Sequence, residues 1–365
     1  MLHIPSNEPH ILRPCMTYPS DYSQTQGPPY YSHRPDSSET DPYQDLVDWY
    51  AKKVLNYSDG TLHGVTSFGS SDSLYTALSV AKARFSREFS NPQPVVMASS
   101  EAHSSLQEIC QMLKLPLFRI VTRKQKGMDM DLLKAVLEDE PHAIVVLTMG
   151  SLKHQLYDNM DELYINVIAK LNRTKIHVHV DATYGGLVYP FLCKKWLVYP
   201  FDTMNVSLHR HLELPYRCAL CVTSAYFKTE LDQFKCNPSH EHMIMSKEAI
   251  PDLVHSLLTD NSIRLHKEEL MKLVNKKNDF MELNPHVRCY HPLSLKVFFR
   301  NIPTELKACL DEYKVVTYPS SQTDEDKDKG ETLNAYLVID KNITRYMLVM
   351  LTSSLGYKFT NLQVH

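Results

Sequence analysis

The chain has 365 residues, and its 39 Lys and Arg side chains nearly balance 42 Asp and Glu, for a formal charge of −3 at pH 7. This balance gives no electrostatic reason to expect nucleic acid or an anionic membrane as a partner. No stretch approaches the roughly 18 consecutive apolar residues of a membrane span. Only 10 glycines are present, whereas average usage of about 7% would give about 25. Ligand loops built on glycine are therefore expected to be absent or lost.

The 8 cysteines are scattered along the chain. The N-terminus has neither the basic nor the apolar segment of a secretory signal. Under those conditions cysteines are expected to be reduced thiols, because disulfide frameworks belong to oxidising compartments. The expected location is therefore cytoplasmic.

The N-terminal residues 1–42 are rich in Pro, Ser and Tyr and have no apolar period. This composition predicts an extended arm that is poorly ordered unless it docks on something. From Tyr43 the apolar residues follow a helical stripe, and a strand and a second helix, from about Asp72, come next.

Residues 43–260 then alternate between short apolar strands and amphipathic helices. The strands are expected at 94–99, 117–122, 143–150, 176–181 and 219–224. Such an alternation is typical of an α/β domain with a mostly parallel sheet covered on both faces. A long helix at about 261–281 follows, and the pattern up to residue 365 predicts a small α+β domain.

Three polar segments follow strands of the large domain. They are Ala98–Ser105, His179–Gly186 and Ser207–Arg210. Ligands of open α/β sheets bind at the carboxyl ends of the strands. These segments therefore mark the candidate site.

With these segments in this order, the chain resembles the group II pyridoxal-phosphate-dependent amino acid decarboxylases, and among them the short serine and histidine decarboxylases. The resemblance covers about residues 43–224. It implies the type I pyridoxal 5'-phosphate (PLP) fold, which is aspartate aminotransferase-like, with a large domain, a mostly parallel sheet and a small C-terminal α+β domain. It also implies PLP as cofactor, an amino acid as substrate and a dimer with the active site at the subunit interface.

The resemblance assigns a role to each segment. His103 would stack on the cofactor ring, Asp181 would pair with the ring nitrogen and Ala182 would lie beneath the ring. A carboxylate in that place keeps the nitrogen protonated, which makes the ring an electron sink. The other cofactor contacts that the resemblance implies are Ser70, Ser71, Ser151, Ser207 and His209.

Four positions depart from the family pattern. Arg210 stands where the Schiff-base lysine is expected, and a guanidinium stays protonated and cannot act as the amine nucleophile. Leu208 and Phe68 replace glycines and are expected to crowd the phosphate. Asp72 replaces a third glycine, at the start of a helix, where its own carboxylate would occupy the anion position.

Other lysines could in principle substitute for the missing one. Lys153 follows a turn near the expected site, and Lys194 and Lys195 lie beyond the strand of Asp181, but all three are expected to be solvated surface lysines. Arg210 could alternatively hold a phosphate or a carboxylate, since its planar fork suits either anion.

No metal site is expected. The chain has one Cys-x-x-Cys and three His-x-His pairs, namely Cys218/Cys221, His177/His179, His209/His211 and His240/His242. Residues two apart on a strand share a face and can be ligands. No second Cys-x-x-Cys is present, however, and chance pairs are expected among 18 histidines.

These observations favour a catalytically impaired homologue of the decarboxylases, a pseudoenzyme with a binding or regulatory role. It would form a homodimer or a heterodimer with an active relative. Two alternatives remain open. One is an active PLP-dependent decarboxylase of histidine, serine or an aromatic amino acid, and the other is a dimeric scaffold.

Overall fold

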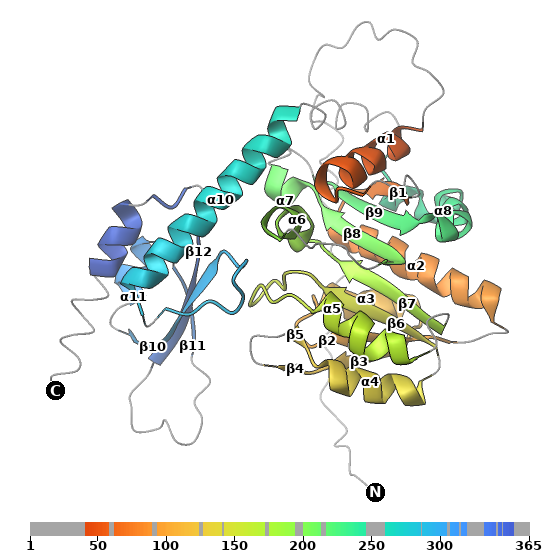
Figure 1. The fold of residues 1–365 in the computed structure, drawn as a ribbon, viewed down its shortest axis with the longest axis horizontal. Coiled ribbons are helices and arrows are strands. Elements are labelled where there is room, and N and C mark those ends of the chain that lie inside the picture. The colour runs from red at the N-terminus through yellow and green to blue at the C-terminus, as the bar shows by residue number, and fades with distance from the viewer. Residues whose placement is uncertain are drawn as a thin grey trace, which may run out of the picture. The chain divides into compact units, whose positions relative to one another are not determined.

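The structure is a computed structural model (Figure 1). The residues that it describes are 41–57, 62–89, 93–123, 127–140, 142–171, 175–193, 200–212, 217–245, 260–285, 287–304, 307–313, 315–319, 332–340, 342–344 and 346–353. The predicted arm, residues 1–42, lies outside the described residues except for Asp41 and Pro42. Lys194 and Lys195 also lie outside them.

A seven-stranded sheet has the order β1-β9-β8-β7-β6-β2-β3. Its strands are β1 (Leu62–Ser67), β2 (Val95–Ser99), β3 (Leu117–Ile120), β6 (Ala143–Thr148), β7 (Ile176–Asp181), β8 (Thr203–Ser207) and β9 (Ala219–Ser224). The pairings from β8 to β3 are parallel, whereas β9 is antiparallel to both β8 and β1. The predicted α/β fold with a mostly parallel sheet is confirmed.

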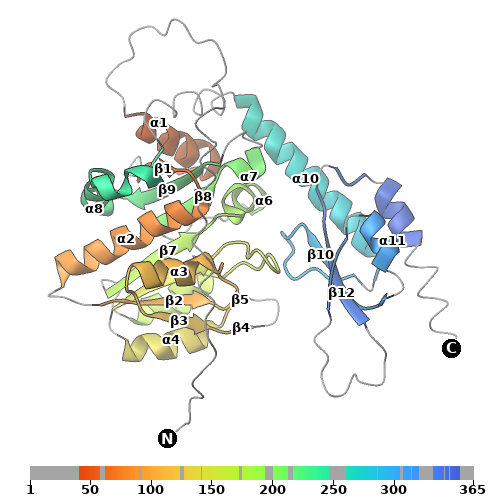
Figure 2. The ribbon, with the colours of Figure 1, turned by 180° about the vertical axis from the view of Figure 1, so that it is seen from behind.

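Helices cover both faces of this sheet. Their bounds are α1 (Pro42–Trp49), η2 (Tyr50–Val54), α2 (Ser70–Glu88), α3 (Ser105–Met112), α4 (Met130–Asp139), α5 (Met160–Glu162), η3 (Leu163–Val167), η4 (Ile168–Lys170), η6 (Gly185–Leu187), α6 (Tyr189–Leu192), α7 (His209–Leu212), η7 (Ala225–Phe227), α8 (Lys228–Lys235) and η8 (Pro238–Met243). Figure 1 shows α2 behind the sheet, and Figure 2 shows it in front. A small hairpin joins β4 (Thr122–Arg123) to β5 (Gly127–Met128).

The alternation of buried side chains explains the two layers. Leu78 of α2 belongs to one core cluster with Val96 and Ile144, while the strand neighbours Met97 and Val145 belong to the other. Successive residues of a strand point to opposite faces. A run of consecutive apolar residues therefore supplies both cores, as expected for strands buried on both sides.

The C-terminal part has its own small sheet, in the order β10-β12-β11, and its own core cluster. Its elements are α10 (Asp260–Leu283), β10 (Lys296–Pro303), α11 (Lys307–Glu312), β11 (Val316–Pro319) and β12 (Thr332–Val338), with further helical residues at 346–353. All pairings are antiparallel. This is the small α+β part that the fold class implies.

Strand β8 is missing from the apolar strands expected from the sequence. Alternate residues of β8 are polar although fully buried, namely Thr203, Asn205 and Ser207. Buried polar side chains need hydrogen-bond partners. Thr203 and Asn205 find theirs in His177 and His179 of β7, whereas Ser207 is bonded to His209.

Candidate functional site

The sheet places the second and third polar segments side by side. Asp181 ends β7, and its register partners are Thr148 on β6 and Asn205 on β8. The Asp181 side chain is 8% exposed, and the Thr183 N–H donates to its Oδ1 at 3.2 Å. Ala182 is fully buried, and its N–H donates to the Asn205 carbonyl at 2.9 Å.

A chain of hydrogen bonds lies behind this turn. His177 Nε2 and His179 Nδ1 each lie 2.9 Å from the Thr203 hydroxyl, and His179 Nε2 lies 2.9 Å from Asn205 Oδ1. Burial lowers the pKa of His179 to about 4, although the charge of Asp181 acts in the opposite direction.

A neutral His179 fixes the direction of these bonds. Its Nε2–H must donate to the amide oxygen of Asn205, so its Nδ1 accepts from Thr203. The amide nitrogen of Asn205 then donates to the Thr183 hydroxyl at 2.8 Å. These hydrogen bonds thus hold Thr183, whose N–H donates to Asp181.

His103 lies in the turn after β2 and is exposed. Its Nδ1 is 2.8 Å from the Ser105 hydroxyl and 3.2 Å from the Ser105 N–H. No described part of the chain covers the His103 ring, so the predicted stacking on a cofactor remains a prediction.

Ser151 and Glu101 connect the turn after β2 to the loop after β6. The Ser151 hydroxyl donates to Glu101 Oε2 at 3.2 Å, and His154 Nδ1 lies 2.9 Å from the same oxygen. Ser151 Oγ also accepts from the Leu156 N–H at 3.1 Å. The predicted cofactor contact Ser151 is therefore bonded within the protein.

Ser207 and His209 bind each other. Ser207 Oγ is 3.1 Å from His209 Nδ1, which also lies 3.1 Å from the N–H of Cys218. Leu208 is fully buried in the main core. Arg210, on α7, is exposed and forms no ion pair with a described residue.

Ser70 and Ser71 are the first two residues of α2; Ser70 is half-buried and Ser71 is exposed. Gly69 is the N-cap, with extended backbone (φ −170°, ψ 168°) and no side-chain cap. Phe68 is 48% exposed. Burial raises the pKa of Asp72, although the charge of His242 lowers it.

The remaining His-x-His pairs have other partners. His211 Nε2 lies 2.9 Å from the Tyr184 carbonyl. The ring of His240 stacks on Phe234, with 4.0 Å between the ring centroids. Among the described residues no group of three His, Cys, Asp or Glu side chains could hold a metal ion. In that part of the chain, no helix has both the length and the apolar character of a membrane span.

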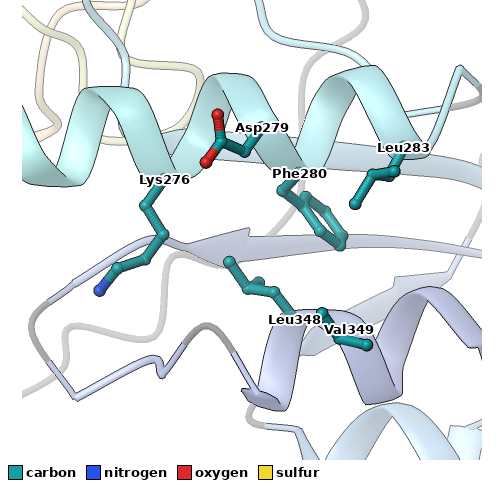
Figure 3. A pocket seen from close by; sticks show the side chains of 6 residues that line it. All are labelled: Lys276, Asp279, Phe280, Leu283, Leu348 and Val349. Atoms are coloured by element: carbon teal, nitrogen blue, oxygen red, sulfur yellow. The ribbon is translucent and has the colours of Figure 1, made fainter.

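Two cavities of the described chain lie away from these residues. One, of about 40 Å³, lies between α10 and the helical residues 346–353, and its lining is mainly apolar, as Phe280, Leu283 and Leu348 show (Figure 3). The other, of about 440 Å³, is an open groove along α2 that includes Tyr75 and His240. Neither contains a predicted site residue.

The residues present do not fit a covalently bound PLP. The residue predicted to bind the ring nitrogen of the cofactor is present, since Asp181 is buried and accepts a hydrogen bond from the Thr183 N–H. At the predicted Schiff-base position, Arg210 offers a guanidinium in place of an amine, and the predicted phosphate-binding segment contains the carboxylate of Asp72. A carboxylate and a phosphate repel each other at the same helix start.

Several features of the site could not be found in the sequence. Glu101 and His154 are 53 positions apart and show no shared motif. The spacing of His177 and His179 is visible in the sequence, but there it is only a weak metal-binding pattern. In the structure both rings instead share the Thr203 hydroxyl as a hydrogen-bond partner.

Similar proteins have been characterised in several organisms. Tryptophan decarboxylase of Clostridium sporogenes is 26% identical over 193 residues, which cover 49% of this chain and 46% of the relative. Serine decarboxylase 2 of Oryza sativa subsp. japonica is 24% identical over 49% of this chain and 38% of the relative. The match thus spans less than half of each of these relatives.

Solved structures share the fold over more of the chain. Catharanthus roseus tryptophan decarboxylase in complex with L-tryptophan has a TM-score of 0.69 at 16% identity, covering 88% of this chain and 75% of that one. Lactobacillus brevis glutamate decarboxylase has a TM-score of 0.67 at 14% identity, covering 88% and 80%. At such identities the likeness establishes the fold alone.

The family model of the pyridoxal-dependent decarboxylase conserved domain matches residues 37–222, about half of the chain. This region contains all the predicted ring, phosphate and Schiff-base positions. On this match, with the order of its motifs and its fold, the chain belongs to the pyridoxal-dependent decarboxylase family.

Proposed function

We propose that this chain is a non-catalytic member of its family, a pseudoenzyme whose decarboxylase fold has a binding or regulatory role. The observation that carries the proposal is Arg210, on α7 just after β8, where the family resemblance predicts the Schiff-base lysine. A guanidinium does not lose its proton and cannot condense with the cofactor aldehyde.

No described lysine offers itself as a replacement. Lys296 is buried, but its Nζ donates to the Leu152 carbonyl at 2.5 Å and lies 4.4 Å from the ring centroid of Tyr336. Lys277 is buried and donates to the Pro292 carbonyl. Lys153 is exposed.

The proposed assembly is a homodimer or a heterodimer with an active relative. Light scattering of the purified chain, alone and mixed with such a relative, distinguishes these states. Co-purification with an active relative, or a stable self-dimer without cofactor, supports the scaffold role. The six cysteines whose side chains the structure describes are free thiols, which supports a reducing, cytoplasmic location.

The residues predicted to contact the cofactor ring favour a second candidate function, an amino acid decarboxylase that binds its cofactor without a covalent bond. Asp181 is buried and bonded, and His103 and Ala182 keep the family residue types. The two candidates differ in turnover. Release of CO₂ from histidine, serine or an aromatic amino acid by the purified chain supports the second.

The test is a PLP titration of the native chain followed by borohydride reduction and peptide mass spectrometry. Arg210→Lys is measured in parallel, and Arg264→Lys, on the exposed side of α10, is the matched control. We expect no stoichiometric pyridoxyl-lysine in the native chain or in the control. A stoichiometric adduct on any native lysine, or sustained decarboxylation, overturns the proposal.

A further inference from the structure

The backbone N–H groups at the N-terminus of α2 can bind an anion. The helix has 19 residues, and its N-cap Gly69 supplies no side-chain hydrogen bond. The first backbone N–H groups of a helix have no partner within it and, with the helix dipole, attract an anion.

Asp72 supplies a negative charge there from within the helix. Its Oδ2 lies 3.7 Å from the place where a Cβ on Gly69 would be, so the carboxylate is folded back over the N-cap. The residue is half-buried. An acidic side chain in the first turn stabilises a helix through the dipole.

A second segment is attached to the strand that precedes this helix. Residues 238–245 bind the end of β1 through a bridge between Ser67 and Ile244 and a 2.9 Å bond from the Met245 N–H to the Thr66 carbonyl. The hydroxyl of Tyr43 donates to the Met245 carbonyl at 2.6 Å. The end of β1, just before the N-cap of α2, is thus held in place by the chain itself.

We infer that the Asp72 carboxylate takes the place of a phosphate at the start of α2, so that this turn binds no phosphate ester. The inference deepens the proposed function and rests on it only in naming a cofactor phosphate as the group replaced. An incoming phosphate has a charge of about −1.5 to −2 at pH 7 and would meet a fixed carboxylate.

Inorganic phosphate is the probe, because it needs no lysine chemistry. Its binding is measured by ³¹P NMR line broadening and by the rise in Tm with phosphate concentration. The proteins are the native chain, Asp72→Asn and the control Asp45→Asn, which changes an exposed aspartate in the first turn of α1. We expect saturable binding by Asp72→Asn alone.

Saturable phosphate binding by the native chain, or none by a folded Asp72→Asn, overturns the inference. Native phosphate binding without a lysine adduct would overturn it while leaving the proposed function in place. A lysine adduct without phosphate binding would do the reverse.

Discussion

Glu101 and His154 form an ion pair with 2.9 Å between Oε2 and Nδ1. The pair joins the turn of His103 to the loop after β6. The ring of His154 also lies against Tyr290, with 4.7 Å between the centroids, so the contact continues into the C-terminal part. These contacts thus fix the turn after β2 and the loop after β6 relative to each other.

We predict that Glu101→Gln lowers the free energy of unfolding by about 1–2 kcal/mol at pH 7. Burial raises the pKa of Glu101, but the hydrogen bond and charge of His154 and the Ser151 hydroxyl outweigh it and leave the pKa lowered. A lowered pKa stabilises the fold above the ordinary glutamate range and loses this effect as the pH falls through the folded value. Urea denaturation should therefore show a cost that shrinks below about pH 4.

The matched control for this prediction is Glu108→Gln, which changes an exposed glutamate of α3. It should leave the stability within about 0.5 kcal/mol of the native value at every pH. If Glu101→Gln costs the same at low and neutral pH, the ion pair does not contribute as described.

The sequence predicted the sheet better than the site. A strand such as Ala143–Thr148 is buried on both faces of the sheet, so nearly all of its residues are apolar and the strand can be recognised in the sequence. Strand β8 was not predicted because it lacks a continuous apolar pattern. Its polar residues Thr203 and Asn205 can be buried because they are hydrogen-bonded to histidines of β7. Pairs such as Glu101 with Ser151 depend on how two loops meet, which no local pattern encodes.

Asp158 gives a second pH prediction. Its two carboxylate oxygens accept 2.7 Å bonds from the N–H groups of Met128 and Thr148, but burial raises its pKa to about 7. A raised pKa stabilises the fold below the ordinary aspartate range, and this contribution is lost as the pH rises through about 7. The native chain should therefore lose up to about 1.4 kcal/mol per pH unit relative to Asp158→Asn between about pH 4 and 7.

Denaturation of both proteins across that range checks the prediction. Asp158→Asn should be the less stable at low pH, because its amide nitrogen faces a backbone N–H. The gap should then narrow as the pH rises, whereas Asp161→Asn, at an exposed position, should track the native chain. A gap that is constant or widens contradicts the raised pKa.

Gln155 supports the start of β10. Its Oε1 accepts from the Ser294 hydroxyl at 2.8 Å and from the N–H groups of Leu295 at 2.8 Å and Lys296 at 3.1 Å. We predict that Gln155→Ala costs about 2–3 kcal/mol, because it leaves buried donors without an acceptor. Gln155→Glu keeps the oxygen and should retain most of the stability. Hydrogen exchange at Leu295 should accelerate only in the alanine variant, and equal exchange in both variants would contradict this role.

Two glycines of this glycine-poor chain make a matched pair. A Cβ on Gly64 would lie 2.5 Å from the Cys221 carbonyl oxygen and 2.5 Å from Val47 Cγ2, whereas a Cβ on Gly69 has its nearest neighbour at 3.7 Å. Gly64→Ala should cost about 3 kcal/mol through overpacking. Gly69→Ala should cost less than about 1 kcal/mol at its N-cap position. Thermal unfolding of the two variants compares them directly, and similar costs would show that β1 can move away from β9.

The last prediction concerns how many changes separate this chain from a cofactor-binding relative. Arg210→Lys restores the amine but leaves the Asp72 carboxylate at the phosphate turn, so PLP should bind weakly and give little trapped adduct. Arg210→Lys with Asp72→Gly removes both obstacles, while Asp181 keeps the ring side in place. We expect the double variant to gain visible absorbance and a stoichiometric adduct at position 210 at PLP concentrations where the single variant gains neither. If Arg210→Lys alone gives the full adduct, the phosphate turn is still competent, and the loss of the lysine is the only change that separates this chain from its catalytic relatives.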